Sequence, residues 1–265
     1  MDRGRDGSAQ AGATTARPPY TQMSMGAMGG RGRGKIFEPV RATTMQTVDV
    51  EQNAYMEPVG AWRRPYCFVR GDETHTEAVA REINQTRSSL GLLDASTLGK
   101  LLVKGPDAGK FLDMLYTNMM STLKPGKCRY GLMCSENGFL IDDGVVARID
   151  EETFLCHTTT GGADHIHAVM EEWLQTEWWD WQVYTANLTE QYAQIAVVGP
   201  NARTLLEKLG GMDVSTEALG FMEWVDGQIA GVDCRIFRIS FSGELSYELA
   251  VSSGQGRGCW DALLT

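Results

Sequence analysis

Two adjacent aspartates, Asp142 and Asp143, are the residues whose type and spacing most clearly could do chemistry. They follow a polar turn and begin a β-rich run within residues 131–149. Successive side chains of a strand point to opposite faces, so one carboxylate can line an interior pocket while the other stays hydrated. An acid on a pocket wall can hold an amine or act as a general base. Considered alone, the pair is also typical of a solvated turn.

A second group of candidate residues lies in residues 241–249. Gly243 marks a bend, and Glu244 and Glu248 follow it. A carboxylate can accept two hydrogen bonds from an amino-pyrimidine-like edge, which presents adjacent N–H donors. Considered alone, however, a glutamate in a strand is more often a charge at a sheet edge.

A third group, residues 156–162, combines a cysteine, a histidine and three threonines with two glycines. Its hydroxyls could line a cleft, or the run could simply join a strand to a helix. Phosphate-loop spacing is absent, and the glycine-rich residues 29–34 do not follow a clear strand. The nearest approach to a zinc site, Cys156 with His157, His165 and His167, lacks the usual ligand spacing, so we expect no metal.

Composition excludes several classes of protein. The 265 residues are 43% hydrophobic, which is typical of a globular fold, and the formal net charge of −10 disfavours nucleic acid as a partner. Apolar runs are too short for a membrane helix, and the N-terminus has no apolar signal core. Six scattered cysteines without a CxxC motif favour a reducing, cytoplasmic location.

The elements that position these residues can be outlined from the sequence. Residues 1–35 predict a flexible linker or leader, and residues 36–265 a folded region whose last helix, 259–265, ends before its domain does. Thr74 and Glu77 form a potential capping box for a helix over 74–90, with Val79, Ile83 and Leu90 near one apolar stripe. Strands are expected at 225–229, 232–241 and 246–252. The pattern predicts an α+β fold.

Two segments of the chain resemble each other, and we call this similarity the internal echo. Residues 101–112 and 195–206 each read as a β-rich run, a Gly-Pro turn and a helical pattern. Proline suits the first helical position because its missing N–H has no partner there. The two segments predict a duplicated supersecondary unit.

The order of these motifs resembles the glycine-cleavage T-protein (aminomethyltransferase) superfamily, whose domains bind tetrahydrofolate. The resemblance is carried by residues 91–118, 123–149, 197–209 and 237–251, and covers most of residues 75–252. Residues 94–100, 142–149 and 171–178 look most like the C-terminal half of the α subunit of heterotetrameric sarcosine oxidases. Thr97 and Leu98 stand where T-proteins usually carry a His-Met pair, which argues against a free-standing T-protein.

The resemblance implies an aminomethyltransferase-like fold of antiparallel sheets and packed helices, with the C-terminal β-domain missing here. It places the folate-site acid needed for one-carbon transfer at Asp143 and the pterin-holding glutamate at Glu248. Tyr130 matches a tyrosine near the folate, and Thr159 falls where T-proteins often have an asparagine. A partly desolvated acid has a raised pKa and could exchange protons with a folate amine.

The activity implied is oxidative demethylation of sarcosine to glycine, with the one-carbon unit passed to tetrahydrofolate as 5,10-methylenetetrahydrofolate. Flavin (FAD or FMN) and NAD are expected elsewhere in the assembled enzyme, with a flavin-bearing β subunit and smaller subunits as partners. The alternatives are a stand-alone T-protein, a dimethylglycine-type demethylase, or a non-catalytic folate-binding or assembly module.

Overall fold

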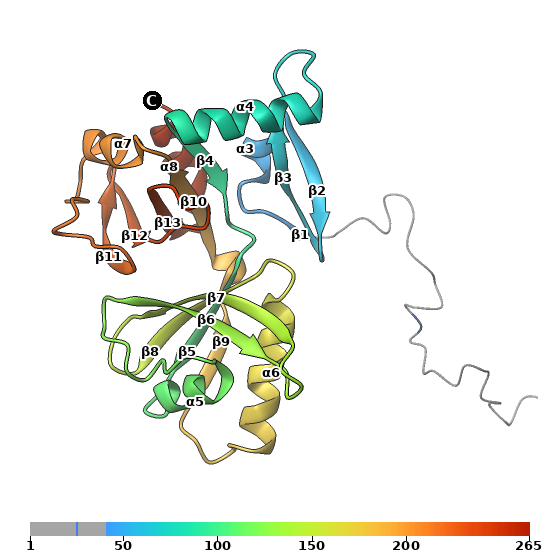
Figure 1. Ribbon diagram of the computed structural model, residues 1–265, viewed down its shortest axis with the longest axis vertical. Coiled ribbons are helices and arrows are strands. Elements are labelled where there is room, and N and C mark those ends of the chain that lie inside the picture. Colours follow the sequence, from blue (N-terminus) through green and yellow to red (C-terminus); the bar gives the residue numbers. More distant parts are fainter. Residues whose placement is uncertain (1–24, 26–40) are drawn as a thin grey trace, which may run out of the picture. The chain divides into compact units, whose positions relative to one another are not determined.

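The chain divides into two units, Met1–Glu38 and Pro39–Thr265, and the computed structural model describes Met25 and residues 41–265. The expected leader, residues 1–35, therefore lies outside the described residues except for Met25. The second unit contains three sheets (Figure 1). In its described part, no helix is long and apolar enough to cross a membrane.

The three sheets differ in size, and all but one of the strand pairs are antiparallel. Sheet 1 has the order β1-β3-β2, with β1 Arg41–Ala42, β2 Ala54–Val59 and β3 Trp62–Phe68. Sheet 2 has the order β11-β12-β13-β10-β4, with β4 Gly91–Asp94, β10 Tyr192–Val198, β11 Glu223–Ile229, β12 Val232–Arg238 and β13 Ser246–Ser252. Sheet 3 has the order β6-β7-β8-β5-β9, with β5 Gly99–Lys104, β6 Cys128–Cys134, β7 Leu140–Arg148, β8 Thr153–Thr158 and β9 Tyr184–Asn187.

The helices of the described chain are short to medium in length. They are α3 Gln46–Glu51, α4 His75–Ser88, α5 Ala108–Leu115, α6 Ala163–Thr176, α7 Ala202–Leu209 and α8 Gly256–Leu263, with single 3₁₀ turns at Thr189–Gln191 and Ser253–Gln255. The helix predicted at the end of the chain therefore begins three residues earlier than expected. The α+β class with antiparallel sheets and packed helices is confirmed.

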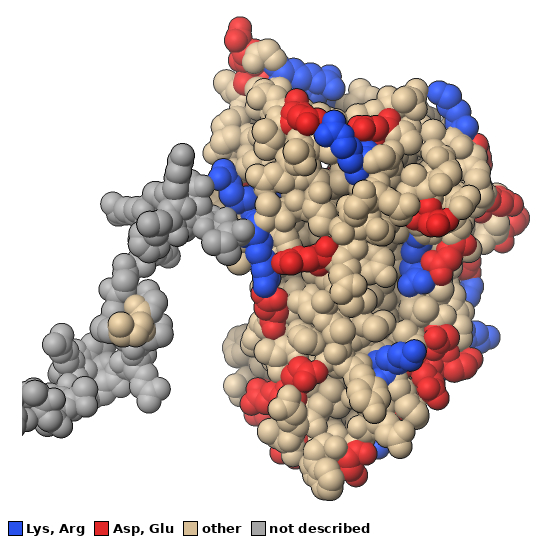
Figure 2. All heavy atoms as spheres, turned by 180° about the vertical axis from the view of Figure 1, so that it is seen from behind, with Lys and Arg blue, Asp and Glu red and all other residues tan. Residues whose placement is uncertain are grey.

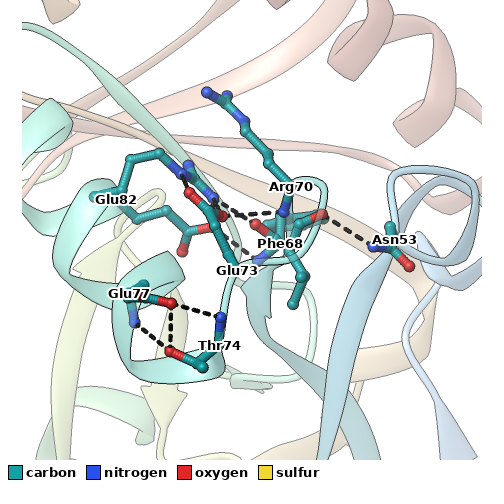
Figure 3. A network of polar contacts seen from close by, with 9 residues as sticks. Asn53, Phe68, Arg70, Glu73, Thr74, Glu77 and Glu82 are labelled. Carbon is teal, nitrogen blue, oxygen red and sulfur yellow. Dashed lines mark hydrogen bonds and ion pairs between the residues drawn. The ribbon is translucent and has the colours of Figure 1, made fainter.

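Helix α4 begins as the sequence predicts. The Thr74 hydroxyl accepts from the Glu77 backbone N–H, and the Glu77 carboxylate accepts from the Thr74 N–H at 2.9 Å (Figure 3). Arg81 then pairs with Glu73 at 2.8 Å and donates to the Phe68 carbonyl, which fastens the helix to the end of β3. The expected apolar stripe is only partly buried.

The internal echo is a real structural repeat. In both copies the strand next to the short edge strand, β5 or β10, leads through a Gly-Pro turn into a helix, α5 or α7. Gly105 and Gly199 have φ values of +139° and +124°, and a Cβ atom there would lie 2.0 and 2.4 Å from the Gln182 and Thr86 carbonyl oxygens. Side chains are therefore excluded from both turns. The prolines precede the N-cap residues, so the expectation that they occupy the first helical position was wrong.

The repeat extends to the strand order of the two large sheets. Read from the short edge strand, sheet 3 runs β9-β5-β8-β7-β6 and sheet 2 runs β4-β10-β13-β12-β11. In the chain, β4 of sheet 2 precedes β5 of sheet 3, and β9 of sheet 3 precedes β10 of sheet 2, so β4 and β9 are exchanged between the two copies. Corresponding positions on β5 and β10 therefore occupy equivalent places in the two sheets.

Three apolar clusters hold the second unit together. One packs sheet 2 against α7 and α8, and another packs sheet 3 against α5 and α6. The third joins β6, β7 and β8 to β12 and β13 through Cys128, Ala147, Leu155, Phe237, Ile239 and Ala250. Sheets 2 and 3 therefore face each other. Burial of this apolar surface stabilises their contact.

Four tryptophans lie close together in residues 173–181, three of them packed against the interior and one on the surface. Trp178 stacks on Trp173 and Trp181 with ring centroids 5.3 and 4.9 Å apart, and these three pack against the sheet 3 core. Trp179 is 77% exposed. On the face drawn in Figure 2, acidic and basic side chains are interspersed. All six cysteines are unpaired, and only Cys134 among them is exposed.

Candidate functional site

The hairpin of β6 and β7 brings two of the sequence-predicted site residues together. The register pairs Tyr130 with Val145 and Leu132 with Asp143, so Tyr130 and Asp143 are diagonal neighbours on one face. The Tyr130 hydroxyl donates to Asp143 Oδ2 at 2.5 Å, and this hydrogen bond raises the pKa of the phenol. Tyr130 therefore stays protonated and fixes one oxygen of the Asp143 carboxylate.

The two aspartates are separated, as strand alternation requires. Asp142 is buried, while Asp143 is partly exposed. Asp142 Oδ1 accepts from the backbone N–H groups of Asp143 at 2.8 Å and Thr159 at 3.2 Å. Asp142 thus ties β7 to the turn that precedes α6. The remaining oxygen of Asp142 lies close to Gly162, where a Cβ atom would approach it to 2.2 Å.

Thr159, expected near the folate, lies beside Asp142. Its hydroxyl accepts from the Gly162 N–H at 3.1 Å, and its own N–H bonds Asp142. Nearby, the buried hydroxyls of Thr97 and Thr160 are 3.0 Å apart. Thr97 is thus part of a hydrogen-bonded pair of threonines.

Glu248, on β13, lies in a polar group in the interior. The side-chain amide of Gln194 on β10 donates to Glu248 Oε2. Burial raises the pKa of Glu248, and the Gln194 hydrogen bond and the charge of Lys100 oppose that rise. The Lys100 side chain is fully buried, and burial lowers its pKa to about 8 against the attraction of Glu248 and Asp94.

Strand alternation places Asp143 and Glu248 on facing surfaces. Asp143 shares a face of β7 with Ala147, and Glu248 shares a face of β13 with Ala250. Ala147 and Ala250 both belong to the apolar cluster between sheets 2 and 3. The candidate carboxylates, with Tyr130, therefore lie on the faces of sheets 2 and 3 that carry this cluster.

Two hollows of the described chain lie elsewhere. One, of about 620 Å³, is lined by β11 and β12 residues such as Asp226 and Arg235. The other, of about 730 Å³, lies among α4, β4 and α8 and includes Arg87 and Glu244, which form an ion pair at 3.0 Å. Neither hollow includes Asp143 or Glu248. Glu244 therefore does not belong with Glu248.

Sequence reasoning missed two residues of the inter-sheet space, Lys100 and Gln194. Both precede the matched apolar runs of the internal echo, so they occupy corresponding inward positions on β5 and β10. A polar residue at the same position of both copies was the signal that could have found them. His157 was considered only as part of a polar run and of a rejected zinc site.

His157 is neutral in this environment. Its Nδ1 lies 3.1 Å from the Val145 carbonyl oxygen, which can only accept, so Nδ1 carries the proton. Burial, with the charge of Lys100 adding to it, lowers the pKa of His157 to about 4. Its Nε2 is buried without a hydrogen-bond partner among the described residues, and so is Gln194 Oε1. The space between the sheets therefore contains acceptors with unused capacity.

Comparisons with known proteins agree with this architecture. The chain is 46% identical to the sarcosine oxidase subunit alpha of Corynebacterium sp. (strain U-96) over 97% of its length, covering 27% of that protein. It is 41% identical to the corresponding subunit of Rhizobium meliloti (strain 1021), again over 97% of this chain and 26% of that protein. The chain thus spans about a quarter of the length of these relatives.

A solved structure shares the fold. The glycine cleavage system aminomethyltransferase T from Bartonella henselae matches with a TM-score of 0.73 and 25% identity, over 85% of this chain and 57% of that one. Residues 45–265 match a family described as the GCVT N-terminal domain. That match includes both large sheets and every candidate site residue. The chain belongs to the GCVT N-terminal domain family.

Proposed function

We propose that this chain is the folate-binding part of a sarcosine oxidase α subunit. The identity to sarcosine oxidase α subunits over nearly the whole chain supports the enzyme class. The observation that carries the folate site is the position of Asp143, Tyr130 and Glu248 on the facing surfaces of two sheets. Residues far apart in sequence thus lie on the surfaces that the two sheets turn toward each other.

The acceptors between the sheets fit a reduced pterin. Its pyrimidine edge presents adjacent N–H donors, which Glu248 can accept through its carboxylate. Gln194 Oε1 is buried without a partner among the described residues, and it adds a neutral acceptor next to Glu248. When bound, tetrahydrofolate supplies the nitrogen nucleophiles that take up a one-carbon unit.

Asp143 has the role of proton carrier at the other end of the site. Tyr130 occupies Oδ2, which leaves Oδ1 to accept a proton from a folate amine or return it. Holding the carboxylate by a hydrogen bond orients it and reduces the freedom lost when the reactants meet. Thr159 contributes through Asp142, which it helps to fix.

The complete reaction extends beyond this chain. The assembled enzyme would demethylate sarcosine to glycine and pass the one-carbon unit on as 5,10-methylenetetrahydrofolate. Flavin and NAD would be held by the remaining polypeptide and by a flavin-bearing β subunit, with smaller subunits completing a cytoplasmic complex. Co-purification with flavin-bearing subunits would distinguish this assignment from a stand-alone aminomethyltransferase.

Titration with tetrahydrofolate tests the site. Glu248→Gln should abolish or greatly weaken binding, whereas Glu244→Gln, which alters an ion pair outside the site, should leave the affinity unchanged. In the assembled enzyme, Asp143→Asn should leave sarcosine oxidation intact and release the methyl carbon as formaldehyde. Equal affinity of both glutamate variants, or an unchanged yield of methylenetetrahydrofolate with Asp143→Asn, would contradict the proposal.

A further inference from the structure

We infer that Lys100 is a positioning residue whose buried ammonium keeps Glu248 ionised for the pterin edge, while Gln194 holds the carboxylate in place. The inference rests on the proposed folate site and adds two residues to it. Its first part, the counter-charge, concerns groups of this chain alone and can be tested without folate.

The first support is the surroundings of the Lys100 ammonium. Nζ donates to the carbonyl oxygens of Ser96 at 3.0 Å and Leu98 at 2.7 Å, and both acceptors are neutral. An ammonium has three N–H donors, so one remains. Removing such a charge from water costs several kcal/mol unless an opposite charge compensates. Two carboxylates, Glu248 and Asp94, attract the Lys100 ammonium, and Glu248 is the one on the facing sheet strand β13.

A chain of hydrogen bonds connects the two groups. Ser96, whose carbonyl binds Lys100, also accepts the Gln194 backbone N–H through its hydroxyl at 3.0 Å. The Gln194 side chain then donates to Glu248 Oε2. Any shift of Lys100 and the Ser96 turn is therefore transmitted to the residue that orients the carboxylate.

The strands independently place Lys100 and Glu248 opposite each other. Lys100 pairs with His157 in the register of β5 and β8, and Phe237 pairs with Glu248 in the register of β12 and β13. The rings of His157 and Phe237 meet edge to face across the two sheets, with centroids 5.1 Å apart. Because His157 and Phe237 touch, their strand neighbours Lys100 and Glu248 lie in the same part of the space between the sheets.

The other titratable groups that face this space do not compete with Lys100. Burial raises the pKa of Cys128 to about 12 and lowers that of His157 to about 4, so both are neutral near pH 7. Arg235 is held by two hydrogen bonds to Asp226, each 2.8 Å long. Asp94, on β4, also attracts the Lys100 ammonium, and its carboxylate accepts hydrogen bonds from Thr43 and Ser96. Among the described residues, Lys100 is therefore the cation that acts on Glu248.

The ionisation of Glu248 determines what the site can bind. An ionised carboxylate offers only acceptors and can take two N–H donors, whereas a protonated one places an O–H against a donor edge. Burial favours the protonated form, and the Gln194 hydrogen bond and the charge of Lys100 oppose it. Without Lys100, the carboxyl group should bind a proton at higher pH and lose the pterin edge there.

Lys100→Met tests the inference because methionine keeps the length and removes the charge. The pKa of Glu248, followed by carboxyl carbon NMR and assigned with Glu248→Gln, should rise by about one unit or more. At pH values below both the native and the new pKa of Glu248, tetrahydrofolate affinity should fall about tenfold for each unit of that rise, and the loss should disappear above the new pKa. Lys104→Met, at the exposed end of the same strand, should change neither measurement.

The outcomes separate this inference from the proposed function. If the pKa of Glu248 is unchanged in folded Lys100→Met, the counter-charge role of Lys100 is refuted, whatever the affinity for tetrahydrofolate. Failure of the unaltered chain to bind tetrahydrofolate at any pH, with a shifted Glu248 titration, refutes the folate site alone. If Lys100→Met does not fold, the ammonium of Lys100 in Glu248→Gln decides the question: its pKa should fall below the native value, and an unchanged value overturns the inference.

Discussion

Asp49 gives a prediction whose size follows from the structure. Its side chain is fully buried in α3 beside Asp94, which is itself bound by the Thr43 hydroxyl at 2.5 Å and the Ser96 N–H at 2.9 Å. Burial and the negative charge of Asp94 raise the pKa of Asp49 from 3.8 to about 8. The folded chain therefore keeps a proton near neutral pH that the unfolded chain releases.

The sign and size of the effect follow from linkage. Below pH 3.8 both states hold the proton, and above about 8 neither does. Between these values the folded state binds one more proton, so the free energy of unfolding falls by about 1.4 kcal/mol for each pH unit. From pH 5 to pH 7 the Asp49 contribution should therefore decrease by about 2.7 kcal/mol.

Asp49→Asn removes this titration while keeping the shape of the side chain. Urea unfolding of both proteins at pH 5 and pH 7 measures the effect. The free energy of unfolding of the variant, relative to that of the native chain, should be about 2.7 kcal/mol higher at pH 7 than at pH 5. Contributions of groups that do not contact Asp49, such as His157, are common to both proteins and cancel in the difference. A stability difference that is the same at both pH values would refute the reasoning.

Two further predictions concern the turns that support the site. Gly199→Ala should lower the free energy of unfolding by more than the roughly 1–2 kcal/mol of a left-handed conformation, because its Cβ would also meet a backbone oxygen at 2.4 Å; Gly126→Ala, at φ +82° with open space around it, should cost less. An equal loss in urea unfolding would contradict the close approach. Asp142→Ala should destabilise by about 1–3 kcal/mol because two backbone N–H groups lose their acceptor. An unchanged unfolding midpoint would exclude the structural role of Asp142.

Local signals predicted much of the fold. The capping box of Thr74 and Glu77, the strands β11 and β13 and the repeat around the two Gly-Pro turns all depend on residues close in sequence. The exchange of β4 and β9 between the sheets was not predictable, because it depends on long-range pairing. Ile83, expected on the buried stripe of α4, is 50% exposed, because the apolar pattern did not reveal which face a partner covers.

Local sequence patterns also predicted part of the candidate site. Alternation required Asp142 and Asp143 to face opposite sides, and the structure separates them. The resemblance selected Tyr130, and its bond to Asp143 follows from the hairpin register. The buried charge of Lys100 was missed because a lysine at a strand position is normally a surface residue. Only the facing of the two sheets brings Lys100 to Glu248.

The structure of the chain in complex with tetrahydrofolate tests the central claim most directly. The account predicts that the pterin lies between sheets 2 and 3, with its amino-pyrimidine edge on Glu248 and its N10 side toward Asp143. Tetrahydrofolate bound in another part of the chain, or with Asp143 and Glu248 both outside hydrogen-bond distance, would contradict it.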